Sequence, residues 1–178
     1  QAGGDINLVT YSEADAQADT FGIAIGAGAL GVSDAKASIS TNINTSVGSA
    51  THVTSTGGAI NVQATHNYTA DGLSTQNKQA RATAISGSGG VLVGTSGAIA
   101  DAASFVNVNT IVDGVLYAGG DVHITADVYN KSNAAAMGLG VGGLVGVGLS
   151  ISTADTGGAV SALSNGVVAG QSLTLRAR

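Results

Sequence analysis

The chain has 178 residues, of which 28 are Gly, and it contains no Pro, Cys or Trp. Its net charge is −5 with only six Lys and Arg, which are scattered, so it lacks the basic patch that nucleic-acid binding requires. Hydrophobic residues form 44% of the chain, which disfavours disorder through low hydrophobicity. With few aromatic residues, such a chain must bury small apolar side chains by close backbone packing.

One short unit recurs along the chain. Gly-Gly-Asp-Ile-Asn-Leu occupies residues 3–8, and related hexapeptides begin at residues 57, 119 and 170. A spacing of roughly 50 to 60 residues indicates a repeat architecture, in which each unit buries its apolar face against the next. We therefore expect a single repetitive domain, residues 1–178, divided into units 3–56, 57–118 and 119–169 and the start of a further unit at 170–178. The sequence starts and stops within the pattern and shows no signal peptide, so we expect a segment of a longer protein.

Each unit opens with two strand-like phrases. Apolar residues alternate with polar ones after the Gly pair, as at Ile6 and Leu8 or at Val122 and Ile124, which is the period of a half-buried strand. A polar stretch punctuated by Ala follows, as at residues 13–19. Alternating Ala predicts a strand whose inner face has little room.

A Gly-rich, uncharged phrase comes next, at residues 21–31, 87–97 and 137–149. In the third copy Leu139 and Val141 share one strand face and glycines share the other. We predict a turn or bulge at Gly142-Gly143 between two buried strands. The alternative is a membrane-spanning helix over residues 134–153, which would use Gly138 and Gly142 as a helix contact. The density of Gly and its recurrence in the other units disfavour this alternative.

A longer alternation closes each unit. Asn42-Ile43-Asn44 and Asn107-Val108-Asn109 are matching phrases, which suggests asparagine side chains stacked between coils. Gly at every second or third position costs a helix about 1 kcal/mol each, so helix is disfavoured throughout. The residues predicted to face inward are Ala35, Ala37, Ile39, Thr41, Ile43, Thr45, Val47, Ala98, Ala100, Ala102, Val106, Val108 and Val112.

Short strands separated by turn glycines, repeated roughly every 50 to 60 residues, are compatible with three all-β architectures: a sandwich, a propeller or a solenoid. Propeller blades usually carry aromatic signatures, which this chain lacks, and a sandwich need not show repeats. We therefore predict an all-β fold, a β-solenoid (β-helix) of about three repeats that each give about two coils.

The repeats of this chain combine Ala-Gly-Gly-Asp-Val with alternating hydrophobic residues, a Gly-Val-Gly phrase, and a Ser-Ile-Ser or Val-Asn-Val-Asn strand. This succession, clearest at residues 118–169, resembles the repeats of giant bacterial surface and secreted exoproteins. These include the filamentous-haemagglutinin-like repetitive adhesins. The resemblance implies a β-solenoid stalk at the bacterial cell surface that works in adhesion, aggregation or matrix building.

No catalytic, cofactor-binding or metal-binding residue is predicted. His52, His66 and His123 show no ligand spacing, and a solvent-facing His123 is favoured. Calcium at the Gly-Gly-Asp sequences is an alternative to simple corner turns, but the continuation of the calcium-binding repeat is missing. Glu13, Asp15 and Asp19 form the densest acidic cluster, which we assign to a solvated face rather than to an acid/base pair.

These observations predict a non-enzymatic, extracellular structural or adhesive segment without a cofactor. Its expected partners are neighbouring repeats or copies of itself end to end, and a surface glycan or receptor, but neither nucleic acid nor a membrane span. Two alternatives stay open: a carbohydrate-active β-helix enzyme, and a flat face that binds glycan or ice.

Overall fold

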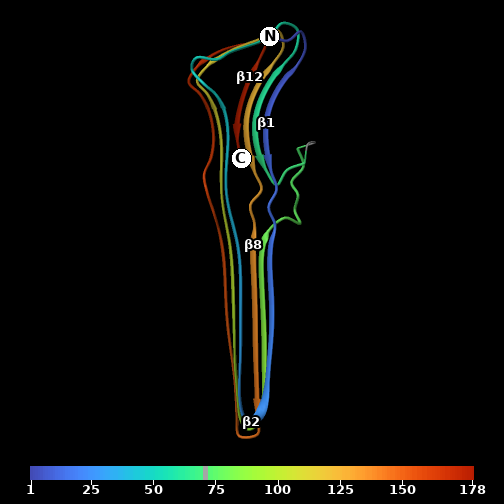
Figure 1. Ribbon diagram of the computed structural model, residues 1–178, viewed down its shortest axis with the longest axis vertical. Coiled ribbons are helices and arrows are strands. Elements are labelled where there is room, and N and C mark those ends of the chain that lie inside the picture. The colour runs from blue at the N-terminus through green and yellow to red at the C-terminus, as the bar shows by residue number, and fades with distance from the viewer. Residues whose placement is uncertain (70–71) are drawn as a thin grey trace.

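The computed structural model describes residues 1–69 and 72–178, and these form a long, narrow molecule built from strands (Figure 1). No helix occurs in that part of the chain. The strands are β1 (Ile6–Ser12), β2 (Ala16–Val47), β3 (His52–Ser55), β4 (Ile60–His66), β5 (Ala80–Val112), β6 (Val115–Ala118), β7 (Val122–Val128), β8 (Ser132–Gly142), β9 (Val145–Gly157), β10 (Val160–Ser164), β11 (Val167–Ala169) and β12 (Leu173–Ala177).

The strands form three parallel sheets, and the predicted all-β class is confirmed. One sheet has the order β1-β4-β7-β12, a second has β3-β6-β11, and in the third β5 pairs with β2 on one side and with β8, β9 and β10 on the other. Equivalent residues of successive repeats pair directly, as Ile6 with Ile60 and Ile60 with Val122.

Each repeat therefore forms one layer, and the prediction of two coils per repeat is wrong. The physical reason lies in β2 and β5, which run for 32 and 33 residues and double back on themselves. In β2 the Thr20 hydroxyl lies 2.7 Å from the Ser33 hydroxyl, which joins the two halves of the strand. The Gly-rich phrase thus lengthens one layer instead of starting another.

The doubled segments stack into a projection that we call the arm, residues 16–38, 80–103 and 132–155. It makes up the lower part of Figure 1. In the third layer its two halves are β8 and β9, which are separated at Gly143 and Leu144. The predicted turn at Gly142-Gly143 is therefore confirmed.

The inward side chains become smaller along the arm. Ile43, Val108 and Val160 occupy one inward row near the body, whereas Ala37, Ala102 and Ala154 form a row further out. Gly26, Gly90 and Gly142 share the row at the tip. A Cβ atom on Gly22 would lie 2.8 Å from the Val32 carbonyl oxygen, so the two halves of the strand approach backbone to backbone. The spacing between the walls is therefore set by Gly at the tip and by Val and Ile at the base.

The inward alternation is confirmed, but the expected burial of the Gly-rich strands is wrong. All of the predicted inward residues except Thr41 are buried, and Thr41 is partly buried. In the arm, however, small residues occupy the inner face, as at Gly22, Ala24 and the buried Ser86, so the large apolar side chains of the same strands point outward. Leu139 and Val141 are 62% and 58% exposed. The fully buried core of the body consists of Val47, Ile60, Val62, Val112, Leu116, Val122 and Ile124.

The Gly-Gly sequences form corners between strands, as predicted. At these corners Asp5 Oδ1 accepts a hydrogen bond from the Ala59 amide at 2.8 Å, and the Ser172 hydroxyl donates to Asp121 Oδ1 at 2.7 Å. Each carboxylate thereby ties one layer to the next. The asparagine phrases also align, since Asn42 pairs with Asn107 and Asn44 with Asn109.

Candidate functional site

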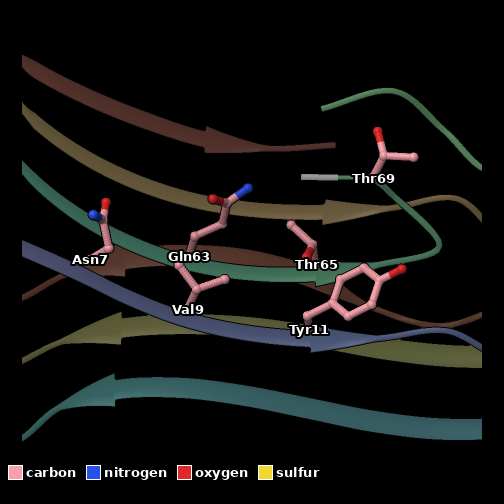
Figure 2. Close-up of a pocket in the computed structure, with 6 residues that line it drawn as sticks. All are labelled: Asn7, Val9, Tyr11, Gln63, Thr65 and Thr69. Atoms are coloured by element: carbon pink, nitrogen blue, oxygen red, sulfur yellow. The ribbon is translucent and has the colours of Figure 1, made fainter. Parts of the chain in front are cut away.

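A hollow lies on the outer face of β1 and β4 (Figure 2). It has a volume of about 520 Å³. Two adjacent strands and the segment after β4 contribute its walls. The lining residues are Asn7, Val9, Tyr11, Gln63, Thr65 and Thr69.

Strand alternation explains why these side chains meet. Asn7, Val9 and Tyr11 are the exposed positions of β1, between residues that turn toward the core. In β4 the inward residues Val62 and Ala64 alternate with Gln63, which is partly exposed, and Thr65, which is only 5% exposed. The parallel register sets Val9 beside Gln63 and Tyr11 beside Thr65.

The third wall comes from the segment that follows β4. Thr69 is held in place by Leu73, whose amide donates to the Thr69 hydroxyl at 3.1 Å, while that hydroxyl donates to the Leu73 carbonyl at 3.2 Å. Figure 2 shows Thr69 on the segment beyond the end of β4, near Thr65, with its hydroxyl turned away from Tyr11.

Two contacts fix the polar groups of the hollow. The Asn61 side-chain amide donates to Asn7 Oδ1 at 2.7 Å, which orients the Asn7 amide. A hydrogen bond to Glu13 raises the pKa of Tyr11, and partial desolvation and the Glu13 charge act in the same direction. The Tyr11 phenol is therefore neutral at physiological pH and serves as a hydrogen-bonding group.

The hollow offers amides, hydroxyls, one aromatic ring and one aliphatic side chain, and none of its lining residues is charged. Tyr11 is 51% exposed, so its ring is accessible. Such a surface suits a neutral, polyhydroxylated ligand that stacks on the ring and hydrogen-bonds at its edges. The lining lacks the pair of carboxylates that glycoside hydrolysis uses.

The histidines of the sequence analysis lie on different strands. His52 is exposed in β3, and His123 is partly exposed in β7, turned away from the buried Val122 and Ile124. His66, at the end of β4, is fully buried, and its Nδ1 lies 3.3 Å from the Ser12 hydroxyl. Burial lowers the pKa of His66.

The acidic cluster lies on one exposed side, as predicted. Lys78 Nζ is 3.9 Å from a Glu13 carboxylate oxygen, and the Gln79 amide donates to Asp15 Oδ1 at 3.1 Å. A hydrogen bond from Gln17 is the main cause of a lowered pKa at Asp19. The carboxylates of Glu13 and Asp15 thus engage the segment between β4 and β5.

Residues 1–69 and 72–178 contain no group of three His, Cys, Asp or Glu side chains arranged to hold a metal ion. Within the same residues there is no long apolar helix that could cross a membrane. Neither a family model, a curated protein nor a solved structure matches this chain.

This hollow was not predicted from the sequence. Its strands were predicted, and the aromatic Tyr11 at an outward position of β1 was the available signal. The missing part was Thr69, because nothing in the letters indicates that the segment after β4 folds beside the outer face of β1.

Proposed function

We propose that this chain is a β-solenoid segment of an extracellular bacterial repeat protein, a non-enzymatic unit that serves as a stiff stalk or filament in adhesion, aggregation or matrix building. The in-register stacking of whole repeats supports this proposal. Every strand of one layer pairs with the same strand of the next, so the pattern is open to continuation at both ends. Unpaired edges of this kind promote association with further strands.

The last strand shows how the stack would continue. The Arg178 amide donates to the Ala126 carbonyl at 3.0 Å, and the Ser172 carbonyl accepts from Val122 at 2.8 Å, so both use their backbone groups toward β7. In a parallel strand the backbone groups of successive residues point alternately to the two neighbouring strands. The amides of Leu173, Leu175 and Ala177 therefore point away from β7, toward the open edge. A further layer would bind there.

Electron microscopy of the native protein tests the proposal. Filaments with a repeat of about 4.8 Å along their axis are expected, since that is the inter-strand spacing. Leu175→Pro removes one amide of the open edge without removing a hydrogen bond to β7, so it should shorten the filaments. Leu175→Val, which keeps the amide, is the matched control. Monodisperse particles that never lengthen with concentration would refute the filament.

A second candidate function, glycan binding, is favoured by the hollow around Tyr11. Its neutral hydroxyl and amide lining beside an exposed ring is the observation that carries it. A panel of oligosaccharides should show binding that Tyr11→Ala abolishes. Tyr117→Ala is the control, because Tyr117 is similarly exposed, at 48%, in another sheet. Equal loss in both variants, or no binding by the native chain, would count against the hollow as a glycan site.

A further inference from the structure

The outer part of the arm is uncharged in all three layers. We call this part the distal arm, residues 20–33, 84–98 and 136–150, which lie in register with one another. It contains no Asp, Glu, Lys, Arg or His, and no Asn or Gln. The charged residues of the arm lie nearer the body.

The distal arm carries most of the exposed apolar surface of the described residues. Fifteen large apolar side chains are exposed there, Ile25 at 86% and Leu144 at 77%. Soluble monomers rarely expose contiguous apolar patches larger than a few hundred Å², and each of these fifteen side chains is at least 41% exposed. They are Phe21, Ile23, Ile25, Leu30, Val32, Val91, Leu92, Val93, Met137, Leu139, Val141, Leu144, Val145, Val147 and Leu149.

This surface covers both walls and the tip. In the first layer it ends at Asp19 and Asp34, whereas in the second and third layers Ile99 and Ile151, which lie in the row of Asp34 and are 41% and 47% exposed, extend it one row toward the body on one wall. The bond between Thr20 and Ser33 joins the two walls, so the outward neighbours Asp19 and Asp34 lie at the same height. One row nearer the body, Arg81 and Asp101 flank the second layer. Polar residues thus surround the base of an apolar zone on both walls.

The two-sided distribution decides between two occupants. A second copy packed against one wall would meet six of these side chains, since six lie on the opposite wall and three at the tip, whereas a standard protein interface uses about 20–30 residues on each side. The opposite wall and the tip would stay exposed. A lipid surface covers both walls and the tip at once, and it requires no charge complementarity.

We propose that the distal arm inserts, tip first, into the hydrocarbon region of a lipid bilayer. From Phe21 to Gly26 the strand advances by five residues, about 16 Å at about 3.3 Å per residue. The hydrocarbon core is about 30 Å thick, so the tip passes the middle of the bilayer without spanning it. The polar rows of Asp19, Asp34, Arg81 and Asp101 then lie at the headgroups.

The backbone of the middle layer suits this environment. Apart from Val91 and Leu92 at the tip, β5 is paired with β2 on one side and with β8 and β9 on the other, so these amides and carbonyls are satisfied without water. The outer edges of the stack are open in a single chain, and unpaired backbone groups are costly in hydrocarbon. Deep insertion therefore needs these edges to be paired by further layers and in that respect rests on the proposed function, whereas a single chain brings only its tip into the hydrocarbon.

Tryptophan fluorescence tests the insertion, because the chain contains no Trp. A single probe, Leu144→Trp, is mixed with neutral phosphatidylcholine vesicles. Its emission should shift to the blue and be quenched by lipids brominated on their acyl chains. Val167→Trp, at an exposed position of the body outside the arm, should show neither effect.

A charge-insertion variant supplies the second measurement. Ile25→Asp, Val91→Asp and Leu144→Asp combined place a carboxylate on the tip of each layer, and they should lower the vesicle partition coefficient more than about a hundredfold. Circular dichroism checks that the variant stays folded. Leu163→Asp combined with Val167→Asp, in the body, should leave partitioning unchanged.

Three outcomes overturn the inference. They are an unquenched Leu144→Trp probe, equal partitioning of the tip variant and the native chain, and a blue shift that needs no vesicles and rises with protein concentration. The last would assign the arm to a second copy. Filament formation without lipid is measured separately by microscopy, so failure of one proposal is distinguishable from failure of the other.

Discussion

At the residue scale, glycine determines how closely the two walls of the arm approach. A Cβ atom on Gly31 would lie 2.5 Å from the Gly87 carbonyl oxygen, whereas one on Gly97 would meet no atom within 4 Å. A side chain is therefore excluded at Gly31 and tolerated at Gly97.

Gly31→Ala should lower the free energy of unfolding by about 1–3 kcal/mol, the typical cost of overpacking, because backbone rather than a flexible side chain blocks the new methyl group. Gly97→Ala should be neutral or stabilise by up to about 1 kcal/mol, since it restricts the unfolded chain. Urea titration of both variants measures the difference. Equal effects would mean that the walls separate readily.

His66 makes the protein sensitive to acid. Burial lowers its folded-state pKa, so below the ordinary value of about 6.5 the unfolded chain binds more protons than the folded one. Its contribution to stability is therefore full above that pH and is lost as the pH falls below it.

The free energy of unfolding should consequently be lower at about pH 5 than at about pH 7.5, and His66→Gln should reduce this difference. His52→Gln, at an exposed position, should leave the difference unchanged. Chemical denaturation at the two pH values measures it. A native-like pH dependence in His66→Gln would assign the sensitivity to other groups.

At the scale of elements, an ion pair fastens the last strand to the stack. Asp127 of β7 is 2% exposed at its side chain and contacts Arg176 at 2.6 Å and Arg178 at 2.8 Å. The Arg178 guanidinium also lies 5.0 Å from the centre of the Tyr68 ring, in the segment after β4. One carboxylate thus links β7 and β12 and borders that segment.

Asp127→Asn should destabilise the protein by about 1–3 kcal/mol, because hydrogen bonds to a charged group are lost while the shape is kept. Lys78→Gln, which removes the partly exposed pair with Glu13, should cost at most about 1 kcal/mol. Thermal and urea unfolding compare the two. A larger loss in Lys78→Gln would contradict the assignment.

The elements also show how far the sequence predicts the structure. Alternation identified the inward faces around Ile43 and Val108 because strand period alone determines them. Alternation did not reveal that β2 doubles back, because the same alternating sequence is compatible with one long layer and with two short coils. Nor did it show that the Gly face of β8 turns inward, which requires knowing that two walls meet there. Thr69 reaches the hollow through a segment with no periodic signal.

At the scale of the whole molecule, pairing is unequal among layers. β5 has a neighbouring strand on both sides, whereas β12 is paired only with β7 and β9 only with β5. The amides of β5 should therefore exchange with deuterium most slowly in the dispersed protein, and those of β9 and β12 fastest. Mass spectrometry after timed exchange measures this order. Uniform protection in a dispersed sample would contradict the layered account.

The residue-by-residue pairing along the arm has an evolutionary consequence. Residues of adjacent layers pair almost without interruption from the base of the arm to its tip, apart from a register shift between Gly26 and Gly28. A deletion of two residues in the arm of one layer would leave residues of the adjacent layers without a backbone partner. The length of the arm therefore changes only if adjacent repeats change together. The segment between β4 and β5 carries no such constraint. Descendants of this gene should therefore vary in length there first, while their arms keep a common length.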